Sequence, residues 1–178
     1  GHAQAQAVAQ ALAKEKFAAV YSSDLSRARQ TAQPVARLLS MQVLVEPGLR
    51  ERHYGIFERL TYAEVRQRYP EDYARFERRD PDYDFRTGEG LRAFSERAVN
   101  CVRALAGRHP GESILLVTHG GVLDKLYRYV ARLPLSAERD FGIPNCGINR
   151  VEAAQDGWRI RVWADVAHLE SALDDLPE

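Results

Sequence analysis

Four consecutive residues, Thr118-His119-Gly120-Gly121, stand where an apolar run ends and a helical pattern begins. The run from Ile114 to Val117 is typical of a buried parallel strand, and the apolar spacing from Val122 to Val130 indicates a helix. The turn between them therefore lies at the carboxyl end of a strand, where open α/β sheets bind ligands. There the imidazole of His119 could bind a phosphate or transfer a proton, and the helix N-terminus at Gly120 could bind an anion. The same pattern also fits a histidine that merely caps the turn.

A second strand–turn–helix pattern places Arg27 at the same edge of the sheet. Residues 17–21 read as a strand, Ser22 to Asp24 as a polar turn, and Arg27 falls in the first turn of the helix that follows. A guanidinium group is well matched to phosphate oxygens. An arginine at this position can equally be a solvated surface charge, which is how we interpret Arg29 and Arg37.

A polar loop follows the short strand 42–45 and the turn Pro47-Gly48. It places Glu51, Arg52, His53 and Tyr54 next to one another. Loops carried by an α/β scaffold are frequent sites of catalysis, and a carboxyl group beside cationic side chains can serve as an acid or a base.

Four motifs, in an order and spacing that cover nearly the whole chain, resemble those of the histidine phosphatase superfamily, the phosphoglycerate mutase-like group. They are Ser22-Ser23-Asp24-Leu25-Ser26-Arg27-Ala28-Arg29-Gln30-Thr31-Ala32, Leu49-Arg50-Glu51-Arg52-His53-Tyr54-Gly55, Gly88-Glu89-Gly90-Leu91 and Thr118-His119-Gly120-Gly121.

The resemblance implies a role for each matching residue. Arg27, His119 and Gly120 would bind the transferred phosphoryl group, and His119 would also stabilise its charge. Glu51 would act as general acid and base, with His119 beside it in the catalytic site. Arg52, His53, Tyr54 and Arg86 are candidate substrate contacts. The family uses no metal and no other cofactor, so we expect none.

One departure concerns the nucleophile, which in this family is a histidine in an Arg-His-Gly motif on the first strand. The chain contains no Arg-His-Gly. We expect the nucleophilic strand upstream of Gly1; it could also have been cut away, or lost from a catalytically dead protein. The 178-residue polypeptide as written should then not turn over a phosphate ester. His53 is the one alternative nucleophile, although we expect it to line the pocket instead.

The motifs divide between two branches of the family. Glu51-Arg52-His53-Tyr54-Gly55 is typical of the mutases, whereas the short chain and the region from Arg79 to Leu91 are typical of the phosphatases. We therefore expect a phosphatase that hydrolyses a small phosphate monoester through a phosphohistidine. The alternatives are a phosphoglycerate mutase and a non-catalytic module that binds a phosphorylated ligand.

Composition gives no reason to expect nucleic acid or membrane partners. The 25 basic and 25 acidic residues balance, and no apolar run could span a bilayer. The two cysteines, Cys101 and Cys146, are too few for a disulfide framework or a metal cage, so we expect a reducing cytoplasm. The expected partner is a small phosphorylated substrate, and the sequence leaves a homodimer open.

The alternation of strand and helix patterns predicts a three-layer α/β/α sandwich with a mostly parallel, Rossmann-like sheet, in one domain over residues 1–178. Residues 62–79 should form two helices separated at Pro70, and 91–105 an amphipathic helix. A hairpin is expected over 148–163, turning at Gln155-Asp156-Gly157. Residues 61–90 should form a helical cap over the pocket, in which Arg86 is the candidate contact for an anionic substrate.

Overall fold

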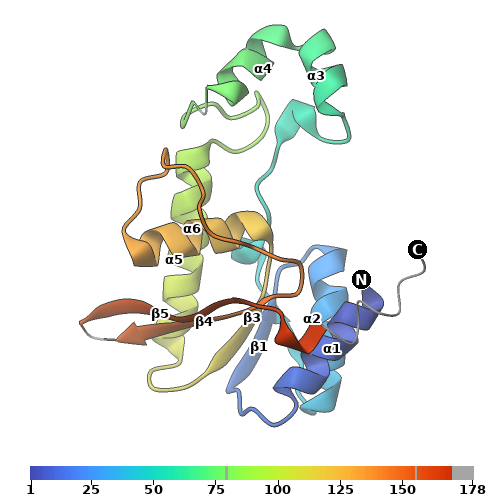
Figure 1. The fold of residues 1–178 in the computed structure, drawn as a ribbon, viewed down its shortest axis with the longest axis vertical. Helices are drawn as coiled ribbons and strands as arrows, with labels where there is room; N and C mark the ends of the chain where they lie inside the picture. Colours follow the sequence, from blue (N-terminus) through green and yellow to red (C-terminus); the bar gives the residue numbers. More distant parts are fainter. Residues whose placement is uncertain (79, 155, 170–178) are drawn as a thin grey trace.

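Helices and strands alternate along the chain in the predicted order (Figure 1). The computed structural model describes residues 1–78, 80–154 and 156–169. The helices and strands are α1 (His2–Leu12), β1 (Ala19–Ser22), α2 (Ser26–Leu38), β2 (Val43–Val45), α3 (Tyr62–Arg68), α4 (Pro70–Glu77), α5 (Leu91–Arg108), β3 (Ile114–Val117), α6 (Gly120–Ala131), β4 (Ile148–Ala154) and β5 (Gly157–Asp165), with 3₁₀ turns at Pro47–Leu49, Gly55–Phe57 and Ala167–Leu169.

Three parallel strands form the sheet, in the order β2-β1-β3. Val20 of β1 lies opposite Val43 on one side and Leu115 on the other. Because the strands run parallel, their carboxyl ends at Ser22, Val45 and Val117 meet at one edge. All three segments singled out in the sequence leave the sheet at that edge.

Alternate residues of the strands pack into two separate cores, one on each face of the sheet. Tyr21 and Leu116 belong to a core that contains Val102 of α5 and Leu126 of α6. Leu115 instead packs into a core formed by α1 and α2. Figure 1 shows these two helix pairs on opposite sides of the strands. The predicted mixed α/β fold, with helices on both faces of a parallel sheet, is confirmed.

The strand β3 is less buried than its apolar sequence predicts. All four residues of β1 are buried, whereas all four of β3 are only partly so. The physical reason is that β1 lies between two strands, while β3 pairs, among the residues that the structure describes, with β1 alone. Among the described residues, β4 and β5 form a separate antiparallel pair and no strand bonds to the second edge of β3. Gln155, in the predicted hairpin turn, lies outside the described residues.

The segment 61–90 contains α3 and α4, which are separated at Pro70 as predicted. Thr61 and Glu64 form a capping box at the start of α3. An aromatic core that includes Phe57, Tyr83 and Phe85 holds the segment together. Figure 1 shows α3 and α4 at the end of the molecule away from the sheet.

The described part of the chain contains no helix that is both long enough and apolar enough to cross a bilayer. The expectation of a single domain over 1–178 stays a prediction, and its last nine residues, 170–178, lie outside the described ranges.

Substitution of Leu49 tests the packing of the core next to the Glu51 loop. Its side chain is fully buried between the sheet and α5, so Leu49→Ala should lower the free energy of unfolding by about 2–5 kcal/mol. Leu44→Ala is the matched control, because Leu44 is 43% exposed and its truncation should cost about 0.5 kcal/mol or less. Urea denaturation measures both. Equal losses in the two variants would contradict the placement of Leu49.

Candidate active site

His119 lies at the N-terminus of α6 and bonds to two residues from the β1–α2 turn. Its Nδ1 accepts a hydrogen bond from Nε of Arg27 at 3.2 Å, and its Nε2 lies 2.8 Å from Oγ of Ser23. The sequence predicted that Arg27 and His119 share one edge of the sheet, and the structure brings them into contact. Ser23, fully buried, was missed as a partner because its motif gave no sign of which way the hydroxyl points.

These contacts fix the protonation of the imidazole. A guanidinium N–H can only donate, so Nδ1 must carry a lone pair and the ring proton belongs on Nε2, where it donates to Ser23. Burial, reinforced by the positive charge of Arg27, holds the pKa of His119 below its ordinary value. His119 is therefore a neutral imidazole next to a permanent cation.

The carboxylate of Glu51 is held at the same helix terminus. Oε2 accepts the backbone N–H of Gly121 at 3.0 Å, and Oε1 accepts that of Arg52 at 2.8 Å. A Cβ atom on Gly121 would lie only 2.0 Å from Oε1 of Glu51. The Glu51 carboxylate thus occupies the space that a side chain at position 121 would take, and a larger residue there would have to displace it.

Side-chain hydrogen bonds from β3–α6 and α5 anchor the Glu51 loop. Thr118 donates its hydroxyl to the carbonyl of Leu49 at 2.8 Å. Arg97 of α5 donates to the carbonyls of Gly48 and Arg50 and pairs with Glu89 at 2.7 Å. Arg97 was missed, because in the sequence it resembles any charged residue beside the apolar face of a helix.

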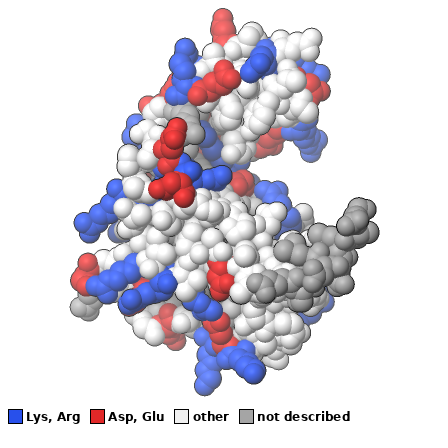
Figure 2. All heavy atoms as spheres, viewed as in Figure 1, with Lys and Arg blue, Asp and Glu red and all other residues white. Residues whose placement is uncertain are grey.

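A cavity of about 640 Å³ adjoins Glu51 and the first turn of α6. This volume is typical of small-molecule sites. Its wall combines the Glu51 loop, the segment 61–90, α5, α6 and the loop after α6. The lining residues are Glu51, Arg52, Tyr54, Phe76, Asp80, Tyr83, Phe85, Leu91, Phe94, Gly120, Gly121, Asp124, Lys125, Arg128, Leu135, Glu138 and Arg139. Figure 2 shows the surface hollowed between the part that carries α3 and α4 and the rest of the molecule.

Of the four candidate substrate contacts, two line the cavity and two do not. Arg52 and Tyr54 line the cavity. His53 does not; its Nε2 lies 3.4 Å from a carboxylate oxygen of Glu58, and its side chain is 54% exposed. Arg86 also lies outside the lining and pairs with Asp72 at 2.6 Å. Neighbours in the sequence thus point to different surroundings, which a motif alone does not reveal.

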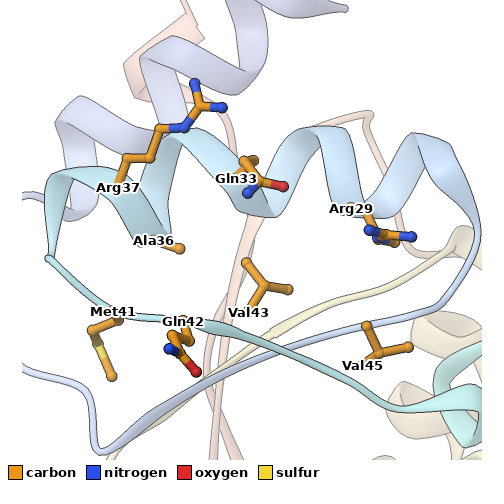
Figure 3. A pocket seen from close by; sticks show the side chains of 8 residues that line it. All are labelled: Arg29, Gln33, Ala36, Arg37, Met41, Gln42, Val43 and Val45. Carbon is orange, nitrogen blue, oxygen red and sulfur yellow. The ribbon is translucent and has the colours of Figure 1, made fainter.

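A second cavity of about 340 Å³ lies between α2 and β2 (Figure 3). Arg29 and Arg37 line it together with Gln33 and residues 41–43 and 45. None of the residues singled out for catalysis contributes to it. Within the described ranges, no group of three or more His, Cys, Asp or Glu residues is arranged to hold a metal ion.

Gly121→Ala should disturb the site more than a glycine replacement in a helix normally does. The new methyl group would overlap Glu51 and approach Phe94 at 3.0 Å, so we expect a loss of about 1–3 kcal/mol in the free energy of unfolding. Gly107→Ala in α5 is the control: no atom lies within 4 Å of the added Cβ, and alanine favours a helix by about 1 kcal/mol. Chemical denaturation compares them, and a stabilised Gly121→Ala variant would contradict the packing of Glu51.

The depressed pKa of His119 predicts that acid weakens the fold. An unfolded histidine takes up its proton near pH 6.5, whereas folded His119 does so only at lower pH. In this window the unfolded state binds more protons, so the free energy of unfolding should fall as pH drops through about 6.5 and level off below the folded pKa. Between pH 7.5 and 5.5 the wild type should show a steeper decline than His119→Asn. Parallel curves would show that His119 does not titrate abnormally.

Comparison with known proteins agrees with this geometry. Residues 1–166 match the model of the histidine phosphatase superfamily, branch 1. The chain is 41% identical to phosphoglycerate mutase-like protein 4 of Arabidopsis thaliana, over 96% of this chain and 74% of that protein. It is 34% identical to a metal-independent phosphoserine phosphatase of the same plant, over 96% and 71%. The crystal structure of a putative alpha-ribazole-5'-P phosphatase from Escherichia coli superposes with a TM-score of 0.85 at 27% identity, covering 93% of this chain and 81% of that one. The chain belongs to the histidine phosphatase superfamily.

Proposed function

We propose that the protein is a phosphatase that hydrolyses a small phosphate monoester through a phosphohistidine. The observation that carries this proposal is the meeting of three groups at one helix N-terminus: the guanidinium of Arg27, the imidazole of His119 and the carboxyl of Glu51. Hydrolysis of phosphate monoesters is among the slowest uncatalysed reactions, so the site must stabilise the charge of the transferred group and protonate the leaving oxygen.

Arg27, His119 and the first N–H of α6 at Gly120 are the groups that would hold the phosphoryl oxygens. A phosphate attracts the Arg27 guanidinium, which would release Nδ1 of His119. A nearby dianion also raises the pKa of an imidazole. Binding would therefore convert neutral His119 into an imidazolium that donates to the phosphate.

Glu51 would supply the proton. When the nucleophile attacks phosphorus, the bond to the leaving oxygen breaks and the Glu51 carboxyl gives that oxygen its proton. In the second half-reaction the Glu51 carboxylate takes a proton from water, the water oxygen attacks the phosphohistidine, and phosphate leaves.

The nucleophile would come from a strand beyond the 178 residues. His53 pairs with Glu58 outside the cavity, which disfavours it as a substitute. In the described ranges the second edge of β3 pairs with no strand. A strand added there parallel to β3 would end next to His119. Residues 1–178 alone should then bind phosphate without turning over an ester.

The similar proteins carry names from both branches, phosphoserine phosphatase and phosphoglycerate mutase-like. The mutase is therefore the second candidate. Transfer of phosphoryl groups to 3-phosphoglycerate, dependent on bisphosphoglycerate, would favour it over hydrolysis.

Calorimetric titration with inorganic phosphate tests the proposed site. Arg27→Met and His119→Ala should each weaken binding about tenfold or more, because each removes a charge-assisted hydrogen bond. Glu51→Gln should leave the affinity within about threefold, since its role begins with proton transfer.

A wild-type protein that fails to bind phosphate would contradict the site. Steady turnover of a phosphate ester by the 178-residue polypeptide would contradict the external nucleophile. Equal activity of Glu51→Gln in the polypeptide that includes the nucleophilic strand would remove Glu51 from the mechanism.

A further inference from the structure

Arg97 projects from the middle of α5 toward the loop that carries Glu51. Its Nη1 donates to the carbonyls of Gly48 and Arg50 at 2.9 and 3.0 Å, and its Nη2 donates to the carbonyl of Glu51 at 3.5 Å. Its Nε and Nη2 also donate to the two carboxylate oxygens of Glu89, at 2.8 and 2.7 Å. A guanidinium group has five N–H donors, and these five contacts use all of them.

Glu89 holds the same loop through its main chain. Its N–H donates to the carbonyl of His53 at 2.9 Å, and its carbonyl accepts from Nε of Arg52 at 2.8 Å. Gly88 allows this close approach, because a Cβ atom there would lie 2.5 Å from the carbonyl oxygen of His53. Together with the arginine of α5, Glu89 therefore bonds to each residue from 50 to 53.

This ion pair differs from the exposed pairs elsewhere on α5. The side chains of Arg97 and Glu89 are 29% and 18% exposed, whereas those of Arg92 and Asp82 are 59% and 68% exposed. Exposed pairs contribute little to a structure, but a bidentate pair with low exposure holds the guanidinium in one orientation. Because the remaining three donors of Arg97 bond to carbonyls of the loop, that orientation fixes the path of the main chain.

The same face of α5 also reaches the carboxylate of Glu51. Phe94 lies three residues before Arg97, so the two side chains are neighbours on the helix, and the guanidinium lies 5.2 Å from the centre of the ring. The ring is 3.0 Å from the Cβ position of Gly121, where the Glu51 carboxylate also lies. Helix α5 thus holds the main chain of the loop and packs beside its catalytic side chain.

We propose that Arg97, oriented by Glu89, is a positioning residue that holds the Glu51 carboxylate at the N-terminus of α6. This inference rests on the proposed function, in which the Glu51 carboxyl gives its proton to the leaving oxygen. Such an acid must lie within about 3 Å of the atom that it protonates, and a displacement of about 1 Å can lower the rate about a hundredfold. Arg97 acts through the loop, since it lies outside the cavity lining.

Hydrogen exchange at the amide of Gly121 tests the position of the carboxylate. This amide lies in the first turn of α6, where the helix offers no acceptor, so its protection reports the bond to Glu51. Arg97→Met should lower the protection about tenfold or more, because the loop loses the hydrogen bonds of a charged donor. Glu51→Ala sets the value expected without the bond. The amide of Val20, in the central strand, is the reference for global unfolding.

Two further variants separate geometry from charge. Arg92→Met is the matched control, because it removes the same charge from the same helix at an exposed pair, and the protection of Gly121 should stay within about twofold. Arg97→Lys keeps the charge beside Glu89 and should fold even if Arg97→Met does not. An ammonium group has three donors and no fork, so the protection should still fall about threefold or more.

Turnover connects this position to catalysis. In the polypeptide that includes the nucleophilic strand, Arg97→Met should lower kcat about tenfold or more and change KM less than about threefold. The affinity of residues 1–178 for inorganic phosphate should also stay within about threefold, because Arg97 contacts neither Arg27 nor His119.

The outcomes distinguish this inference from the proposed function. Equal losses of protection at Gly121 and Val20 would overturn the positioning role, as would a wild-type kcat in Arg97→Met when Glu51→Gln is slow. A wild-type kcat in Glu51→Gln, or a wild type that does not bind phosphate, would instead overturn the proposed function. Exchange at Gly121 would then still decide whether Arg97 holds the carboxylate.

Discussion

The hydrogen bond from the backbone N–H of Gly121 to the Glu51 carboxylate is the contact on which the site depends. It joins the loop after β2 to the helix after β3, two segments separated by seventy positions in the chain. The parallel sheet makes this contact available, because the carboxyl ends of β1, β2 and β3 meet at one edge. Glycine at 121 makes it sterically feasible, because a Cβ atom would displace the carboxylate.

Burial gives the groups at this edge their chemical character. Burial and the contact with Arg27 hold the pKa of His119, which is 7% exposed, below its ordinary value and so favour the neutral imidazole. The same low exposure leaves Lys125 and Arg128 competing for the single carboxylate of Asp124. In the proposed function, a bound phosphate would attract Arg27 and release Nδ1 of His119.

Sequence patterns were sufficient to predict where the residues that follow the strands lie. Each of Arg27, Glu51 and His119 follows a short apolar run, so its position at the sheet edge could be inferred from the chain alone. The direction of a side chain within a loop could not be inferred from the chain. Arg52 lines the cavity, for example, while its neighbour His53 points to Glu58. Lys125 and Arg97 were missed because a charged residue within a helix is usually at the surface, and burial depends on elements far away in sequence. The partial burial of β3 has a similar origin: the apolar sequence does not specify how many neighbouring strands it has.

The protonation of His119 is the most direct measure of the proposed phosphate site. Nitrogen NMR of protein labelled with ¹⁵N-histidine, with the signal assigned by its loss in His119→Asn, reports the charge and tautomer of the ring. At pH 6.5, where an ordinary histidine is about half protonated, we expect His119 to be mostly neutral with its proton on Nε2, and to become an imidazolium when phosphate is added. A ring that is already cationic without phosphate, or one that stays neutral when phosphate saturates the protein, would contradict the site as we describe it.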